Sequence, residues 1–331
     1  MDEQTYHLPQ AKKTFSRIGL AFSAILVVAT ALQLLWFWLP DVILGENNAL
    51  NVSSWWMWLG SIIPMQLIGI PLGVLIMHKL PAQKPEDHKL SAKHFLEFLA
   101  MSFCLMYAGN LIGTFLSSSL SNGQATNAVA EMAMYTNPLK ILAMVILAPL
   151  LEEFLCRKVV IDRTRQYGEK LSVVLSALIF GLLHQNLFQF FYAFGLGLIF
   201  GFIYIRTGRL RYTVLLHIII NFMGGVAAPW IISQVDLNTM MNLDPTASTA
   251  EIMALYEQIL PGLLLLLGYV TVLLGLAITG LVLLIKRCKN LYWADAEEQL
   301  PKGTVGKTAY RNVGMILYMA LCALSIILAL I

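Results

Sequence analysis

Apolar stretches of about 20 residues recur along this chain, the length that a helix needs to cross the hydrocarbon core of a bilayer. Few charges interrupt them, because 58% of the 331 residues are hydrophobic and only 12% are charged. A soluble domain carries roughly 25% charged residues. We therefore expect an all-α fold, a polytopic transmembrane helix bundle for which the lipid bilayer is the surrounding medium.

The apolar runs and the charged breaks between them predict about nine transmembrane spans. These spans cover residues 16–39, 54–78, 95–118, 138–160, 171–189, 190–206, 211–233, 259–286 and 312–331. They divide into N-terminal transmembrane helices in residues 1–137, a central core of four spans in residues 138–233, and C-terminal transmembrane helices in residues 234–331.

The distribution of Lys and Arg predicts the orientation, because cytoplasmic loops of membrane proteins collect positive charge. If the N-terminus is cytoplasmic, all but one of the 22 Lys and Arg residues fall on the cytoplasmic side, and the exception is Lys140. The predicted outer loops, residues 40–53, 119–137 and 234–258, contain acidic residues but no basic residue. We therefore expect a multi-pass protein with a cytoplasmic N-terminus and an extracytoplasmic C-terminus.

Charge and cysteine content exclude two other classes of protein. The net charge of +3 is small, and the basic residues lie between apolar runs, so we expect no nucleic acid partner. The four cysteines have no CxxC spacing and most lie in apolar surroundings, which predicts no disulfide framework.

The fifth and sixth spans are predicted to form a tight hairpin, because only Gln185, Asn186 and Gln189 interrupt the apolar sequence between them. In the sixth span Gly197 and Gly201 have the GxxxG spacing, which lets two helix backbones approach closely. We expect these glycines to serve packing and not chemistry.

Ionisable side chains inside the spans are the candidates for function, because each costs several kcal/mol unless it meets a partner or a cavity. They occur on three of the central spans. These residues are Glu152, Glu153 and Arg157 on the fourth span, His184 on the fifth, and His217 with the amide Asn221 on the seventh.

The spacing of the three charges on the fourth span predicts different environments for its two carboxylates. Glu153 and Arg157 lie four residues apart in the order that favours an ion pair on a helix. Glu152 points about 100° away around the same helix, which leaves it free to act as a base. The alternative is a buried structural network that only fixes the register of the helix.

His217 and Asn221 share one face of the seventh span, because they too lie four residues apart. A lone histidine in a membrane is more often a hydrogen-bond partner between helices than a catalyst. A carboxylate, two imidazoles and a carboxamide together, however, suit water activation and oxyanion stabilisation. Glu152, His184 and His217 also resemble the ligand set of a catalytic zinc ion, although the sequence has no HExxH helix.

At these residues the chain resembles the CPBP family of intramembrane CAAX prenyl proteases and bacteriocin-processing (Abi) proteins, which are related to the Rce1-type CAAX endopeptidases. Three short patterns of the family occur in the family's order on separate predicted helices. They are EExxxR at 152–157, FxxxH at 180–184 and HxxxN at 217–221. The resemblance covers about residues 138–225, roughly a quarter of the chain.

The resemblance implies an intramembrane endopeptidase of the bacterial plasma membrane, with residues 138–233 as its catalytic core. Its substrate would be a membrane-associated or lipidated protein or peptide. Glu152 and His184 would activate a water molecule, and His217 and Asn221 would stabilise the oxyanion. Glu153 and Arg157 would support the site.

The family has been described both as metalloproteases and as glutamic proteases. We expect no cofactor, because a carboxamide on the face of His217 suits oxyanion stabilisation better than zinc binding. A zinc ion held by Glu152, His184 and His217 is the alternative.

Two other functions compete with proteolysis. A family member that acts only as a membrane scaffold or immunity factor has no reason to retain six costly polar residues. A proton-coupled transporter should show interrupted helices in two related halves, and the sequence shows no such internal symmetry.

Overall fold

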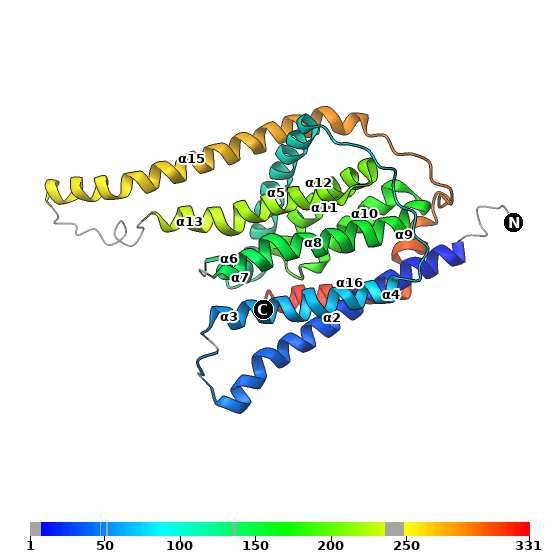
Figure 1. Cartoon of the computed structure of the whole chain (residues 1–331), viewed down its shortest axis with the longest axis horizontal. Helices are drawn as coiled ribbons and strands as arrows, with labels where there is room; N and C mark the ends of the chain where they lie inside the picture. Colours follow the sequence, from blue (N-terminus) through cyan, green and yellow to red (C-terminus); the bar gives the residue numbers. More distant parts are fainter. Residues whose placement is uncertain (1–7, 47, 51, 135–136, 236–247) are drawn as a thin grey trace.

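The computed structural model describes residues 8–46, 48–50, 52–134, 137–235 and 248–331. In these residues the chain consists of helices and connecting segments, without a strand (Figure 1). The predicted all-α fold is therefore confirmed. Six helical stretches in the described part are long and apolar enough to cross a membrane, namely Leu8–Leu44, Ser54–Met77, Ala92–Leu120, Leu187–Thr207, Leu210–Ser233 and Thr249–Asn290.

The helices follow the predicted spans in order, and several contain π-helical segments. The first half of the chain holds α2 (Leu8–Leu44), α3–η1–α4 (Ser54–Ser61, Ile62–Gly69, Ile70–Met77), α5 (Ala92–Leu120), α6 (Ala128–Met134) and α7–η2–α8–η3–α9 (Pro138–Lys140, Ile141–Leu147, Ala148–Glu153, Phe154–Ile161, Asp162–Thr164). The second half holds α10 (Glu169–Leu183), α11 (Leu187–Thr207), α12–η5–α13 (Leu210–Phe222, Met223–Ala227, Ala228–Ser233), α15 (Thr249–Arg287) and α16 (Val313–Leu328). Three short turns, η4 (Arg165–Tyr167), η6 (Cys288–Asn290) and η7 (Gly306–Tyr310), lie between these helices.

The turn between α10 and α11 lies earlier than predicted. Helix α10 ends at Leu183 and α11 begins at Leu187, so Gln189 belongs to α11 and His184 lies at the end of α10. Asn186 decides this boundary, because its side chain accepts a hydrogen bond from the Gln189 backbone N–H at 2.9 Å and caps α11. A strong cap outweighs hydropathy, which varies little along this segment.

Glycines set the closest helix contacts, as the GxxxG spacing predicts. A Cβ atom on Gly197 would lie 2.8 Å from Cα of Ala177, so α11 packs directly on the backbone of α10. The first and last helices of the described residues also pair, because a Cβ on Gly19 of α2 would lie 2.2 Å from the backbone of Gly314 of α16 (Figure 1). Each of these contacts holds two helices too close for any larger side chain.

The segments predicted to be cytoplasmic meet at one end of the bundle. Backbone N–H groups of Gln83 and His88 donate to the carbonyls of Asp162 and Thr207, at 2.6 and 3.0 Å. The described parts of the outer loops lie at the opposite end in Figure 1, where Asn137 donates to Ser54 Oγ at 2.9 Å. The segments predicted to be cytoplasmic and those predicted to be outside thus lie at opposite ends of the bundle. Which end faces the cytoplasm stays a prediction. Residues 236–247 of the outer loop 234–258 lie outside the described residues.

Candidate active site

Glu153 and Arg157 form the predicted ion pair at the centre of the fourth span. Arg157 Nε lies 3.0 Å from Glu153 Oε2, and Nη2 lies 3.3 Å from Oε1. Both side chains are completely buried. A buried pair with this two-pronged geometry compensates much of the cost of removing both charges from water.

Ser176, which sequence analysis did not single out, and Phe180 of the FxxxH pattern complete the surroundings of Arg157. Ser176 of α10 accepts a hydrogen bond from Nη1 at 2.7 Å and donates to the carbonyl of Cys156 at 2.7 Å. The Phe180 ring centroid lies 4.9 Å from the guanidinium carbon, a cation–π distance. Ser176 precedes Phe180 by four residues and so shares its helix face, but a serine in an apolar helix carries no charge that would mark it.

His217 of α12 lies between the two carboxylates of α8. Its Nδ1 is 3.2 Å from Glu153 Oε1, and its Nε2 is 3.9 Å from Glu152 Oε2. The side chain of Glu152 is 20% exposed, whereas those of His217 and Glu153 are 5% and 0% exposed. Glu152 is therefore the one of these two carboxylates whose side chain is partly exposed.

His184 joins the cluster through Phe180. The Phe180 ring meets the rings of His184 and His217 edge-on, with centroid distances of 5.1 and 5.6 Å. Nδ1 of His184 lies 2.8 Å from the backbone carbonyl of Phe180, which can only accept. Nδ1 therefore carries the proton, and Nε2 of the neutral ring keeps a free lone pair.

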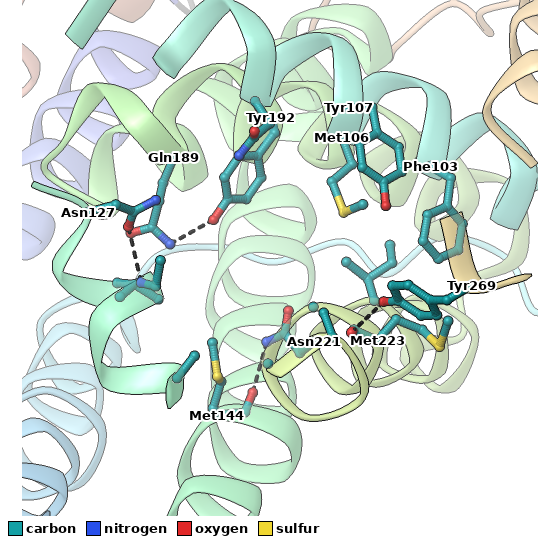
Figure 2. Close-up of a pocket in the computed structure, with 18 residues that line it drawn as sticks. Phe103, Met106, Tyr107, Asn127, Met144, Gln189, Tyr192, Asn221, Met223 and Tyr269 are labelled. Atoms are coloured by element: carbon teal, nitrogen blue, oxygen red, sulfur yellow. Dashed lines mark hydrogen bonds between the residues drawn. The ribbon is translucent and has the colours of Figure 1, made fainter. Parts of the chain in front are cut away.

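Asn221 lies one turn beyond His217 and faces a cavity of about 290 Å³ (Figure 2). Its Nδ2 donates to the carbonyl of Met144 on the fourth span at 2.8 Å. The cavity wall also contains the polar side chains of Asn110, Gln189 and Tyr192. Sequence analysis did not find this cavity, because its walls come from helices far apart in the chain.

The arrangement of the donor atoms bears on the zinc alternative. Zinc needs three or four protein atoms within about 2.0–2.3 Å of one point. No group of three or more His, Cys, Asp or Glu side chains in the described ranges has such an arrangement. As they stand, Glu152, His184 and His217 do not meet in the geometry that a zinc ion needs.

Comparisons with known proteins agree with the three motifs. Residues 135–223, which contain every candidate site residue, match the family described as type II CAAX prenyl endopeptidase Rce1-like. A relative from Staphylococcus aureus (strain USA300), the membrane-embedded CAAX protease MroQ, is 26% identical over 174 residues, which cover 48% of this chain and 70% of the relative. No solved structure matches the chain. The chain is a multi-pass membrane protein whose residues 135–223 are similar to the Rce1-like group of CAAX prenyl endopeptidases.

Proposed function

We propose that this protein is an endopeptidase that hydrolyses peptide bonds of a membrane-associated or lipidated protein or peptide, with Glu152 as the base. The position of Glu152 carries the proposal. It is a partly exposed carboxylate beside a fully buried pair that consists of Glu153 and Arg157. The name of the relative, a CAAX protease, supports a peptide substrate at the membrane.

The geometry supports a general-base reaction. Glu152 takes a proton from a water molecule while the water oxygen forms a bond to the carbonyl carbon of the substrate. The lone pair on Nε2 of His184 orients the same water by accepting its second hydrogen. The C=O π electrons move to the carbonyl oxygen, and the tetrahedral intermediate then collapses. The C–N bond breaks, and the proton held by Glu152 passes to the leaving nitrogen.

His217 and Asn221 would stabilise the oxyanion, and the structure sets a condition on each. His217 already donates from Nδ1 to Glu153, so donation from Nε2 requires a ring that is protonated on both nitrogens. The positive charges of such a ring and of Arg157 would then balance the negative charges of the two carboxylates of α8. Asn221 uses one Nδ2 hydrogen for Met144 and keeps the second for the substrate.

Substitution of Glu152 tests the proposed function. The assay is hydrolysis of fluorogenic peptides, with and without a prenylated cysteine, by the purified full chain in lipid vesicles. Glu152→Gln keeps the shape and removes the base, so we expect kcat to fall and KM to change little. Glu86→Gln, on an exposed carboxylate at the cytoplasmic end, is the matched control and should behave as wild type.

The competing functions predict a different result. If the wild-type protein hydrolyses none of the peptides, a role as a membrane scaffold or immunity factor, or proton-coupled transport, is favoured. If wild type and Glu152→Gln hydrolyse the peptides equally, Glu152 is not the base and the proposed function is wrong in its mechanism.

A further inference from the structure

Tyr192 of α11 lies between the cavity and the cluster of candidate site residues that contains His184. It lines the cavity together with Asn221 (Figure 2). Its ring also meets the ring of His184 edge-on, with centroids 6.4 Å apart. A Cβ atom on Gly109 of α5 would lie 2.4 Å from the Tyr192 backbone nitrogen, so α5 holds this turn of α11 in place.

A chain of hydrogen bonds determines the direction in which the Tyr192 hydroxyl can donate. Asn186 Oδ1 accepts from the Gln189 backbone N–H at 2.9 Å, so Nδ2 is the other end of that amide. Nδ2 of Asn186 donates to the backbone carbonyl of His184 at 2.7 Å and to Gln189 Oε1 at 2.8 Å. Backbone groups thus set the orientation of the Asn186 amide, and Nδ2 of Asn186 in turn sets the orientation of the Gln189 amide.

The consequence is that the Tyr192 oxygen accepts a hydrogen bond and donates none to the part of the chain that the structure describes. Because Gln189 Oε1 faces Asn186, its Nε2 is the atom that lies 2.7 Å from Tyr192 Oη (Figure 2). A tyrosine hydroxyl has one proton, and here that proton is left for another acceptor. Among the described residues no side chain or carbonyl takes it, and the Tyr192 side chain borders the cavity.

We propose that Tyr192 is a further catalytic residue, which donates its hydroxyl hydrogen bond to the carbonyl oxygen of the scissile peptide bond as negative charge develops there. The inference rests on the proposed function. Its support is that Asn221 and His217 each already have a hydrogen-bond partner, Met144 and Glu153, whereas the Tyr192 hydroxyl proton has no acceptor among the described residues. A hydrogen bond from a hydroxyl to an oxyanion is short and strong, and it costs no reorganisation when the donor is already aimed.

Tyr192→Phe tests this proposal because it removes only the hydroxyl. With the fluorogenic peptides, we expect kcat to fall by about 10²- to 10³-fold and KM to change little, as for other oxyanion donors. Tyr204→Phe is the matched control. It removes a hydroxyl from the same helix, where Tyr204 donates to Asp162 at 2.9 Å, and should leave kcat per folded molecule unchanged.

Gln189→Glu tests the direction of the hydrogen bond. A carboxylate at position 189 still accepts from Asn186, but it can only accept from Tyr192 and therefore captures the hydroxyl proton. We expect kcat to fall as in Tyr192→Phe, and the double variant to be no worse than either single variant. Additive losses would show that the two side chains act separately and would overturn the proposal.

The outcomes separate this proposal from the proposed function. If Glu152→Gln is inactive while Tyr192→Phe retains full kcat, or loses only in KM, Tyr192 is not a catalytic donor and the proposed function stands. If Glu152→Gln is as active as wild type, or wild type hydrolyses none of the peptides, the proposed function fails and this proposal fails with it.

Discussion

Replacing Arg157 with alanine is expected to lower the free energy of unfolding by about 3–5 kcal/mol, because it leaves the Glu153 carboxylate buried without its main partner. The guanidinium donates two hydrogen bonds to Glu153, at 3.0 and 3.3 Å, and a third to Ser176 at 2.7 Å. Hydrogen bonds to charged groups contribute roughly 1.5–3 kcal/mol each. The sum over all three bonds therefore reaches or exceeds the expected loss of about 3–5 kcal/mol. His217 Nδ1 stays 3.2 Å from Glu153, and this remaining contact limits the expected loss.

A second substitution distinguishes an uncompensated charge from lost packing. Glu153→Gln, combined with Arg157→Ala, replaces the carboxylate with a neutral amide. We expect the double variant to be more stable than Arg157→Ala alone by about 0.5–3 kcal/mol, the usual size of an interaction between neighbouring residues. Arg287→Ala is the control on an exposed pair, because Arg287 contacts Glu97 with 48% of its side chain exposed. Such pairs contribute roughly 0–1 kcal/mol.

Reversible unfolding of the full chain in detergent micelles, followed by circular dichroism, measures these differences. Peptide hydrolysis by the same preparations shows whether activity falls with stability. The reasoning is refuted if Arg157→Ala unfolds within about 1 kcal/mol of wild type, or if adding Glu153→Gln restores nothing.

Two further predictions concern topology and metal. Segments 79–93, 162–170 and 287–311 should be cytoplasmic, because basic residues resist translocation, so cysteines introduced at Lys84 or Lys302 should not react with an impermeant reagent added outside intact cells. Labelling of these cysteines from outside would show that the predicted orientation is wrong. Chelation should leave wild-type activity unchanged, and purified wild-type and His217→Ala proteins should contain equally little zinc. Stoichiometric zinc that is lost in His217→Ala, with activity restored by adding metal to chelated enzyme, would overturn the mechanism without a metal.

Hydropathy alone was sufficient to predict the class of fold. A segment that crosses a bilayer must satisfy its backbone hydrogen bonds internally, so long apolar runs become helices whatever their neighbours are. The Glu153–Arg157 pair was also predictable, since two residues four apart on one helix meet without help from the rest of the chain. The boundary at Asn186 was not predicted, because a side-chain cap and not hydropathy decides it.

The candidate site was only partly predictable from the sequence. The cost of burying ionisable groups in a membrane marks Glu152, His184 and His217 in the sequence. The residues that surround these groups have no charge or pattern by which the sequence would identify them. Neither Ser176 against Arg157 nor the cavity beside Asn221 follows from any local pattern, because both arise where separate helices meet.

The sequence by itself therefore determined which segments are helices and which polar groups lie inside the bundle. The tertiary structure decided which helix faces meet. In lipid, apolar faces resemble one another, and the close packing of small residues selects among them. The contact of Gly109 with the turn of α11 that carries Tyr192 is such a selection. The direction of the Tyr192 hydroxyl depends in turn on hydrogen bonds from Gln189 and Asn186, which form only after α10 and α11 have folded into their hairpin.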